Sequence, residues 1–254
     1  MTKSIFLKST STLTHYDELL RKANSNTSKL SSSQITTDIG YTLSKGYHID
    51  PTTHYYRAKS EFSGSNIKIS DNGLILDWGC SLGVSTLAIA NLHRNADVIG
   101  LDISKIRINI ATTKTIKNAS LGFVSVYSKN LSCMVREYID EVNGIRLPKG
   151  FIIADGYNAP FSNNTFDAIY CMNNLYYVLN NTIEHSALKK IKNILRLIKN
   201  NGYLLISGTN NSIVQESVIL QNKIGVYTPI YSTFSLDNQE SIKKLSMIVD
   251  NCNT

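Results

Sequence analysis

The sequence predicts an α/β fold, a Rossmann-like three-layer sandwich with a mostly parallel sheet. From Leu74 onward, short apolar runs alternate with segments of helical periodicity. These runs contain few polar residues, which is typical of strands that are buried on both faces. The first run passes into a helical segment through a turn that contains Gly79 and Gly83, as at the first strand-to-helix turn of doubly wound folds.

Each element is predicted from its own pattern. The expected strands are short and rich in Val, Ile, Leu and aromatic residues, whereas the expected helices repeat their apolar residues every three to four positions. The predicted strands are 74–78, 97–102, 151–155, 166–172 and 203–208, and the predicted helices are 84–93, 104–117 and 184–199. A last helix is expected in the segment SLDNQESIKKLSMIVD, where Asp237 and Glu240 have the spacing of a capping box.

The pattern also predicts how the chain is organised. Residues 1–46 are an arm rich in Ser, Thr and Asn, which we expect to be a mobile cover or a tail. Residues 47–210 form the core, and 211–254 form a C-terminal helical extension. An inserted segment at about 119–150 has one apolar helical face, which we expect to pack on the core; a roof over the active site and a subunit contact are the alternatives.

Composition narrows the class of protein. The net charge is +7, but the basic residues are spread along the chain, so nucleic acid is a possible partner that is not favoured. No apolar run is long enough to cross a bilayer and the first residues do not resemble a signal peptide, so we expect a cytoplasmic protein with no membrane partner. The cysteines lack the spacing of a zinc site or a disulfide framework, so we expect reduced thiols and no metal; they are Cys80, Cys133, Cys171 and Cys252.

The turn after the first strand indicates a cofactor site. An acid at the end of a strand, Asp77, precedes Gly79 and Gly83, so a ligand can approach the backbone closely beside the N-terminus of a helix. Dinucleotides and S-adenosylmethionine are both bound in this way. A dinucleotide fingerprint requires glycine at the first, third and sixth positions, but the third and sixth are Ser81 and Val84. The turn therefore does not fit a dinucleotide.

At this point five segments resemble the class I S-adenosylmethionine-dependent methyltransferases. DWGCSLG (77–83) resembles their motif I, with Ser81 in place of the middle glycine, and Asp102 ends the next strand. ADGYNAPF (154–161) resembles the acid and Pro-Phe segment, and NTFDAIYCMNNLYYV (164–178) resembles the Phe-Asp strand with its following turn. LRLIKNNGYLLIS (195–207) resembles the last helix, glycine turn and fifth strand. These matches occur in the family's order and imply its fold and cofactor.

The resemblance assigns the main cofactor contacts. Asp102 would accept both ribose hydroxyls, since a carboxylate takes two O–H donors at once; the alternative is that Asp102 only assists the helix start at Ser104. The turn would line the methionine part of the cofactor through its backbone. Its residues are Gly79, Cys80, Ser81 and Gly83.

The remaining cofactor contacts come from four further segments. Asp77 would favour the ammonium group of the cofactor, and Asp155 would accept from the adenine amino group unless it is a plain turn residue. Gly156 and Ile103 would lie against the two sides of the adenine ring. Asn173 would contact the cofactor or act as a helix cap.

Four residues are candidates for catalysis. Tyr176 and Tyr177 stand after the fourth strand, where the family's small-molecule branch often has histidines, and a tyrosine face attracts a positive charge. His48 and His54 precede the first predicted strand of the core, and histidine is a residue type that ordinarily titrates near neutrality, as a general base requires. Packing or surface roles are the alternatives for all four.

The resemblance also predicts a missing element. The family closes its sheet with an antiparallel hairpin after the last helix, and we expect this sequence to lack it, so the strand 203–208 would be an exposed edge. We expect the arm, a partner or a second copy in a homo-oligomer to cover it, unless the chain is a truncated product.

Taken with the motifs, these observations favour methyl transfer to a small molecule. The turn NNLYY lacks the Asn-Pro-Pro-aromatic element used on amide or adenine nitrogens, and no Pro-Cys pair offers a thiol nucleophile. The resemblance is to the ubiquinone/menaquinone-biosynthesis branch of the family. The alternatives are a tRNA methyltransferase and a non-catalytic, methyltransferase-like binding subunit.

Overall fold

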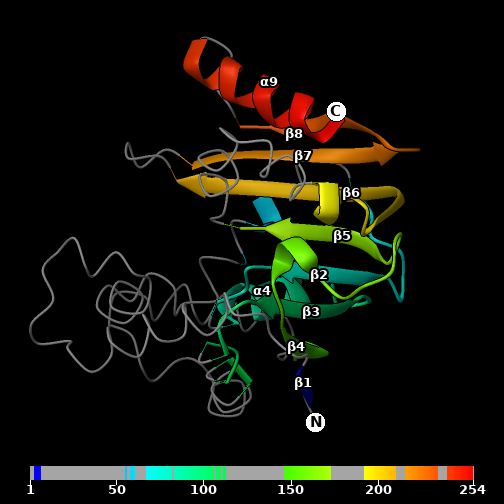
Figure 1. Cartoon of the computed structure of the whole chain (residues 1–254), viewed down its shortest axis with the longest axis vertical. Coiled ribbons are helices and arrows are strands. Elements are labelled where there is room, and N and C mark those ends of the chain that lie inside the picture. Colours follow the sequence, from blue (N-terminus) through cyan, green and yellow to red (C-terminus); the bar gives the residue numbers. More distant parts are fainter. Residues whose placement is uncertain are drawn as a thin grey trace, which may run out of the picture. The chain divides into compact units, whose positions relative to one another are not determined.

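The computed structural model confirms the α/β fold with a mostly parallel sheet (Figure 1). The structure describes residues 3–6, 55, 58–60, 67–81, 83–105, 107–109, 111–112, 146–172, 192–209, 215–233 and 239–253. The strand order of the sheet is β1-β4-β3-β2-β5-β6-β7-β8. The strands are β1 (Lys3–Phe6), β2 (Leu74–Trp78), β3 (Asp97–Asp102), β4 (Gly150–Ile153), β5 (Phe166–Cys171), β6 (Ile198–Thr209), β7 (Gln215–Lys223) and β8 (Val226–Ser232).

The chain divides into two compact units that share strand β3. The first unit contains β1, β4, the end of β3 and helix α4 (Val84–Leu92). The second contains the start of β3 together with β2, β5, β6, β7, β8, the 3-10 turn η2 (Gly156–Asn158) and helix α9 (Gln239–Asn253).

In the first unit, the parallel strands β1, β4 and β3 pair in register. Lys3 of β1 lies opposite Gly150 of β4, and Gly150 lies opposite Ile99 of β3. The start of the N-terminal arm is thus a strand of the sheet, where we expected a cover or a tail. All four positions of β4 are buried, as the unbroken apolar run predicts.

Helix α4 is buried along most of its length and holds the chain that leads into β4. Its residues from Thr86 to Asn91 are buried. The Asn91 side chain donates to the carbonyl of Arg146 at 3.0 Å and accepts from the N–H of Arg146 at 2.7 Å. Because one amide satisfies both backbone groups, the chain before β4 is attached to α4 as a neighbouring strand would be.

In the second unit, the structure corrects our expectation about the end of the chain. Residues 211–254 are not only a helical extension, because β7 and β8 form the antiparallel hairpin that we expected to be missing. β6 pairs with β5 on one side and β7 on the other, so the strand 203–208 is internal and not an exposed edge. The described part of the N-terminal arm, β1, pairs with β4. The final helix is present as α9.

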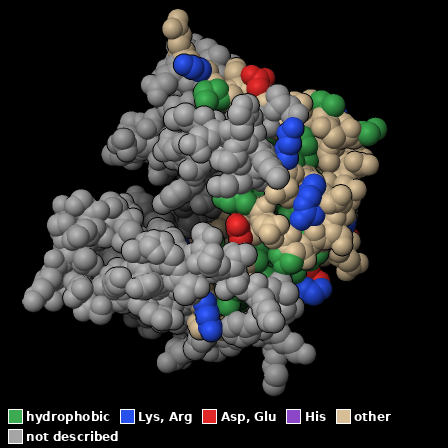
Figure 2. Space-filling view, viewed as in Figure 1, with side chains coloured by type: hydrophobic (Ala, Val, Ile, Leu, Met, Phe, Trp, Pro, Cys, Tyr) green, Lys and Arg blue, Asp and Glu red, His purple; other side chains and the backbone are tan. Residues whose placement is uncertain are grey.

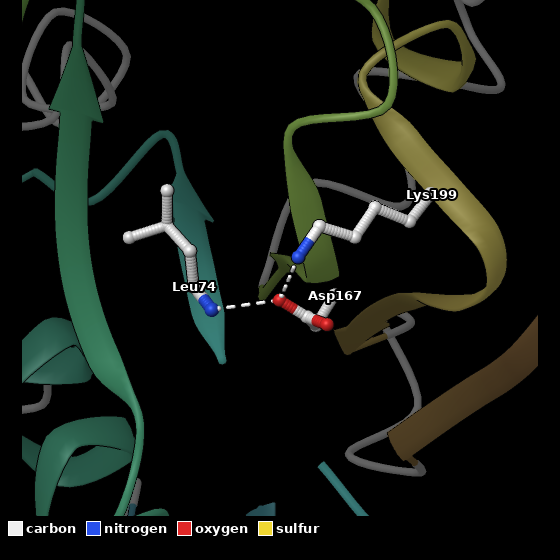
Figure 3. A network of polar contacts seen from close by, with 3 residues as sticks. All are labelled: Leu74, Asp167 and Lys199. Atoms are coloured by element: carbon white, nitrogen blue, oxygen red, sulfur yellow. Dashed lines mark hydrogen bonds and ion pairs between the residues drawn. The ribbon is translucent and has the colours of Figure 1, made fainter. Parts of the chain in front are cut away.

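A single carboxylate joins the beginnings of three parallel strands of the second unit (Figure 3). Asp167 of β5 accepts from the backbone N–H of Leu74, the first residue of β2, at 2.8 Å. The same oxygen accepts from the Lys199 ammonium group of β6 at 2.8 Å. The aspartate of the Phe-Asp strand is therefore a structural contact at the amino ends of the strands, whereas Asp77 and Asp102 stand near or at the carboxyl ends of theirs.

Two predicted helices are only partly described. In the segment 184–199, residues 192–195 are helical, but β6 begins at Ile198 and so takes the last two positions. In the segment 104–117, the described residues from 107 to 112 are helical. The inserted segment lies outside the described residues up to residue 145. Among the described helices, none has the length and apolar character that crossing a membrane requires.

Candidate cofactor site

The turn between β2 and α4 is built from residues in left-handed backbone conformations. Gly79, Ser81 and Gly83 have φ values of 76°, 51° and 78°. At Gly83 a side chain is excluded twice, because a Cβ there would lie 2.7 Å from the Phe151 ring and because φ is positive. The sequence therefore needs glycine at the start of α4, and this brings the backbone of the turn close to β4.

In the first unit, one backbone hydrogen bond connects this turn to β3, and a second one closes the turn itself. The N–H of Cys80 donates to the carbonyl of Leu101 in β3 at 2.9 Å, and the N–H of Gly83 donates to the carbonyl of Cys80 at 2.9 Å. The Cys80 side chain is buried in an apolar cluster with Phe151, and Ile103 packs against this cluster. The Cys80 side chain thus packs the turn onto the apolar core.

Asp102 is the best-defined acceptor of the site. Its Oδ2 accepts from the N–H of Ser81 at 2.9 Å, and its Oδ1 accepts from the N–H of Ser104 at 2.8 Å. The residue is 5% exposed. The contact with Ser104 is the one that the alternative reading expects, and a second contact joins Asp102 to the glycine turn. The role of Asp102 toward the ribose stays a prediction.

In the second unit, Asp77 is buried near the end of β2. It is 1% exposed, and its charge acts on the thiol of Cys171 at the end of β5. Burial raises the pKa of Cys171 far above its ordinary value, and the Asp77 carboxylate raises it further. The thiol therefore stays protonated, so Cys171 is a small buried residue of the core and not an activated nucleophile.

Gly156 has a neighbour that the sequence analysis missed. A Cβ on Gly156 would collide with Nε1 of Trp78 and would lie 2.6 Å from Cε2 of the same ring. The Trp78 ring also meets the Tyr157 ring edge to face, with centroids 5.1 Å apart. Glycine is therefore required at 156 by the indole behind it. The signal available in the sequence was Trp78 itself, the single tryptophan of the chain, which directly follows the motif I aspartate.

Comparison with known families decides the identity of the fold. Residues 76–206, more than half of the chain, match the family model described as "Methyltransferase domain". The chain belongs to this methyltransferase family. The match begins in β2, includes the glycine turn and Asp102, and ends in β6. The resemblance to the methyltransferase family is thus confirmed, whereas the branch within it stays a prediction. The family implies S-adenosylmethionine as the cofactor.

The similarity of this chain to individual proteins is distant. An uncharacterized protein of Methanocaldococcus jannaschii is 26% identical over 152 residues, which are 59% of this chain and 48% of that protein. The chain thus spans about half the length of the curated relative that it matches.

Solved structures show distant likenesses as well. A putative S-adenosyl-L-methionine-dependent methyltransferase from Methanococcus maripaludis has a TM-score of 0.45 and 20% identity, covering 67% of this chain and 63% of that one. A putative methyltransferase from Bacillus halodurans has a TM-score of 0.38 and 15% identity, covering 61% and 53%. At this level of similarity they do not bear on function.

The described side chains have the chemical groups that the implied cofactor would need. S-adenosylmethionine presents ribose hydroxyls, an ammonium group and a carboxylate. Asp102 supplies an oriented carboxylate for hydroxyls, and Asp77 supplies a buried carboxylate of the charge that an ammonium group prefers. Asp155, expected to accept from adenine, is part-buried directly after β4.

Five predicted site residues lie outside the described residues. They are His48, His54, Asn173, Tyr176 and Tyr177. Their proposed roles stay predictions. Within the described ranges, no group of three or more His, Cys, Asp and Glu residues has an arrangement that would hold a metal ion.

Proposed function

We propose that this protein transfers a methyl group from S-adenosylmethionine to a small-molecule acceptor. One observation carries the proposal: Asp102, at the carboxyl end of β3, is oriented by the N–H groups of Ser81 in the glycine turn and of Ser104. A buried carboxylate that is held in place at a strand end has the chemistry to accept from vicinal hydroxyls such as those of a ribose.

The other residues follow from this placement. The backbone of Gly79, Ser81 and Gly83 would line the methionine part, and Asp77 would face the ammonium group. The adenine would lie beside Gly156 and Ile103, and Asp155 would accept from its amino group. The cofactor supplies the chemistry, a methyl group activated on a sulfonium. The protein's contribution is to orient the acceptor in line and to exclude water.

A small molecule is favoured as the acceptor on two grounds. The motifs resemble the ubiquinone/menaquinone-biosynthesis branch, in which the positions of Tyr176 and Tyr177 face the acceptor; His48 or His54 would then serve as a base where the acceptor needs one. In addition, the Lys and Arg residues are spread along the sequence, and those coloured in Figure 2 are separated by other side chains within the parts that are drawn in colour.

Direct binding tests the proposal. We expect S-adenosylmethionine to bind the purified protein with micromolar affinity in calorimetry and to change the fluorescence of Trp78. Because Trp78 is the only tryptophan and packs on Gly156, its emission reports on the residues next to the proposed adenine position. NAD, which has the adenosine but not the methionine part, is the matched control and should not compete.

Each outcome separates the candidate functions. Binding of S-adenosylmethionine followed by methylation of a small molecule from a screened set supports the proposal. Binding with salt-dependent tRNA affinity and tRNA methylation would replace the acceptor by tRNA. No binding at millimolar S-adenosylmethionine would refute the enzymatic function and leave the non-catalytic subunit.

A further inference from the structure

Strand β8 is the last strand in the order of the sheet, and α9 lies beside it (Figure 1). A side chain of α9 occupies the outer edge of β8. The Tyr227 N–H donates to Oδ1 of Asn253 at 2.7 Å, and the Asn253 side-chain amide donates to the Tyr227 carbonyl at 2.9 Å. One side chain therefore makes both hydrogen bonds that an adjacent strand would make to Tyr227.

The register of the hairpin explains why Tyr227 offers these groups. Lys223 and Val226 flank a two-residue turn and pair with each other. Such a pair exchanges both of its hydrogen bonds, so the next pair, Asn222 with Tyr227, directs its backbone groups away from the partner strand. The Tyr227 side chain is anchored on the inner side, where its O–H donates to the carbonyl of Leu195 at 2.8 Å. Burial raises the pKa of this phenol, so it remains a donor.

The neighbouring positions of the edge offer little to an incoming strand. The next residue with outward backbone groups is Pro229, which has no N–H. The pairing register then shifts so that Ile230 has no partner, which is a bulge. Within 226–229, Tyr227 is thus the residue whose backbone N–H and carbonyl both point away from β7. Asn253 makes hydrogen bonds to both of these groups. Proline, a bulge and a covering element are the known protections of an edge strand.

We propose that Asn253 closes the edge of β8 against a second copy of this chain, and that its removal opens the edge to antiparallel β8–β8 pairing centred on Tyr227. The edge is self-complementary, because the free N–H and carbonyl of Tyr227 in one copy would match those of Tyr227 in the other. Val226 is 55% exposed and Ile230 is 36% exposed, so the released edge also carries apolar side chains for such a contact.

The test compares Asn253→Ala with Ser246→Ala, a change at an exposed position of the same helix. Sedimentation equilibrium should show a monomer for the wild type and for Ser246→Ala, but for Asn253→Ala an average mass that rises with concentration toward twice the monomer mass. Asn253 is itself exposed, so we expect the variant to fold, and thermal melting checks this. Asn253→Asp keeps the acceptor and loses the donor, so it should associate more weakly than Asn253→Ala.

Hydrogen exchange at the Tyr227 amide identifies the surface that is used. In Asn253→Ala the amide should exchange faster than in the wild type at low concentration and become protected as the protein associates. A folded Asn253→Ala variant that stays monomeric at every concentration would overturn the proposal. Association that leaves the Tyr227 amide unprotected would overturn it as well, because the contact would then lie elsewhere.

Discussion

Replacing Asp102 by alanine should weaken the binding of S-adenosylmethionine by ~1–3 kcal/mol, which is about 5-fold to 150-fold in Kd. The substitution removes the proposed acceptor of the ribose hydroxyls. It also leaves the N–H groups of Ser81 and Ser104 without their carboxylate, so the glycine turn loses its side-chain contact with the end of β3. Calorimetry measures the affinity, and thermal melting measures the accompanying loss of stability.

Two further variants separate binding from folding. Asp102→Asn keeps the shape but can offer an oxygen to only one of the two N–H groups, so its NH2 group would face a donor and the affinity should fall as well. Asp71→Ala removes an exposed carboxylate that accepts from Asn95 at 2.8 Å, and this should leave the affinity unchanged. If Asp102→Ala binds the cofactor as the wild type does, the ribose contact is assigned to the wrong residue.

The second large effect is expected at Gly100 in β3, where alanine should destabilise the fold by ~1–3 kcal/mol. A Cβ there would lie 2.6 Å from Cδ1 of Phe151 and 2.9 Å from Sγ of Cys80. Phe151 is 1% exposed and Cys80 is 2% exposed, so neither can move aside without disturbing the core beneath the glycine turn. Thermal melting should show a Tm lower by about 2–12 °C for a chain of this size.

Gly225→Ala is the matched control for the loss of stability expected of Gly100→Ala. No atom lies within 4 Å of a Cβ at Gly225, but φ there is +86°, so this variant has strain of the backbone without overpacking. A double-mutant cycle with Phe151→Leu tests the cause at Gly100: the cost of Gly100→Ala should shrink when the ring is absent, whereas the cost of Gly225→Ala should not. Equal costs of Gly100→Ala in both backgrounds would show that the ring is not the obstacle.

The hairpin shows where the sequence was misread. A two-residue hairpin turn usually contains Asn-Gly or Asp-Gly, because both central residues need positive φ. Here the turn is Ile224-Gly225, with φ values of 56° and 86°, and a β-branched residue is unfavourable in that conformation. β7 also lacks the alternation of a half-exposed strand, since Val218, Ile219 and Leu220 are all buried. The sequence thus has neither the usual turn residues nor the alternating pattern of a hairpin. The two strands are stabilised instead by their pairing in the sheet.

The elements that position the site were predictable because their signals are local. Strands β2, β3, β4 and β5 are apolar runs, and the acid and glycines at their ends mark where the chain turns at the carboxyl edge of the sheet. The contact of Gly156 with Trp78 was not predictable, because these residues are far apart in sequence and a glycine alone does not reveal which side chain needs its space.

The sequence by itself determined the α/β class, the glycine turn before α4 and the carboxylate at the end of β3, since each depends on residue types within a few positions of one another. Only the tertiary structure decided which backbone groups hold Asp102, which ring requires Gly156, and that β6 is internal to the sheet. These features depend on contacts between segments that are distant in the chain, and such contacts are set by packing and strand register, which local residue patterns do not specify.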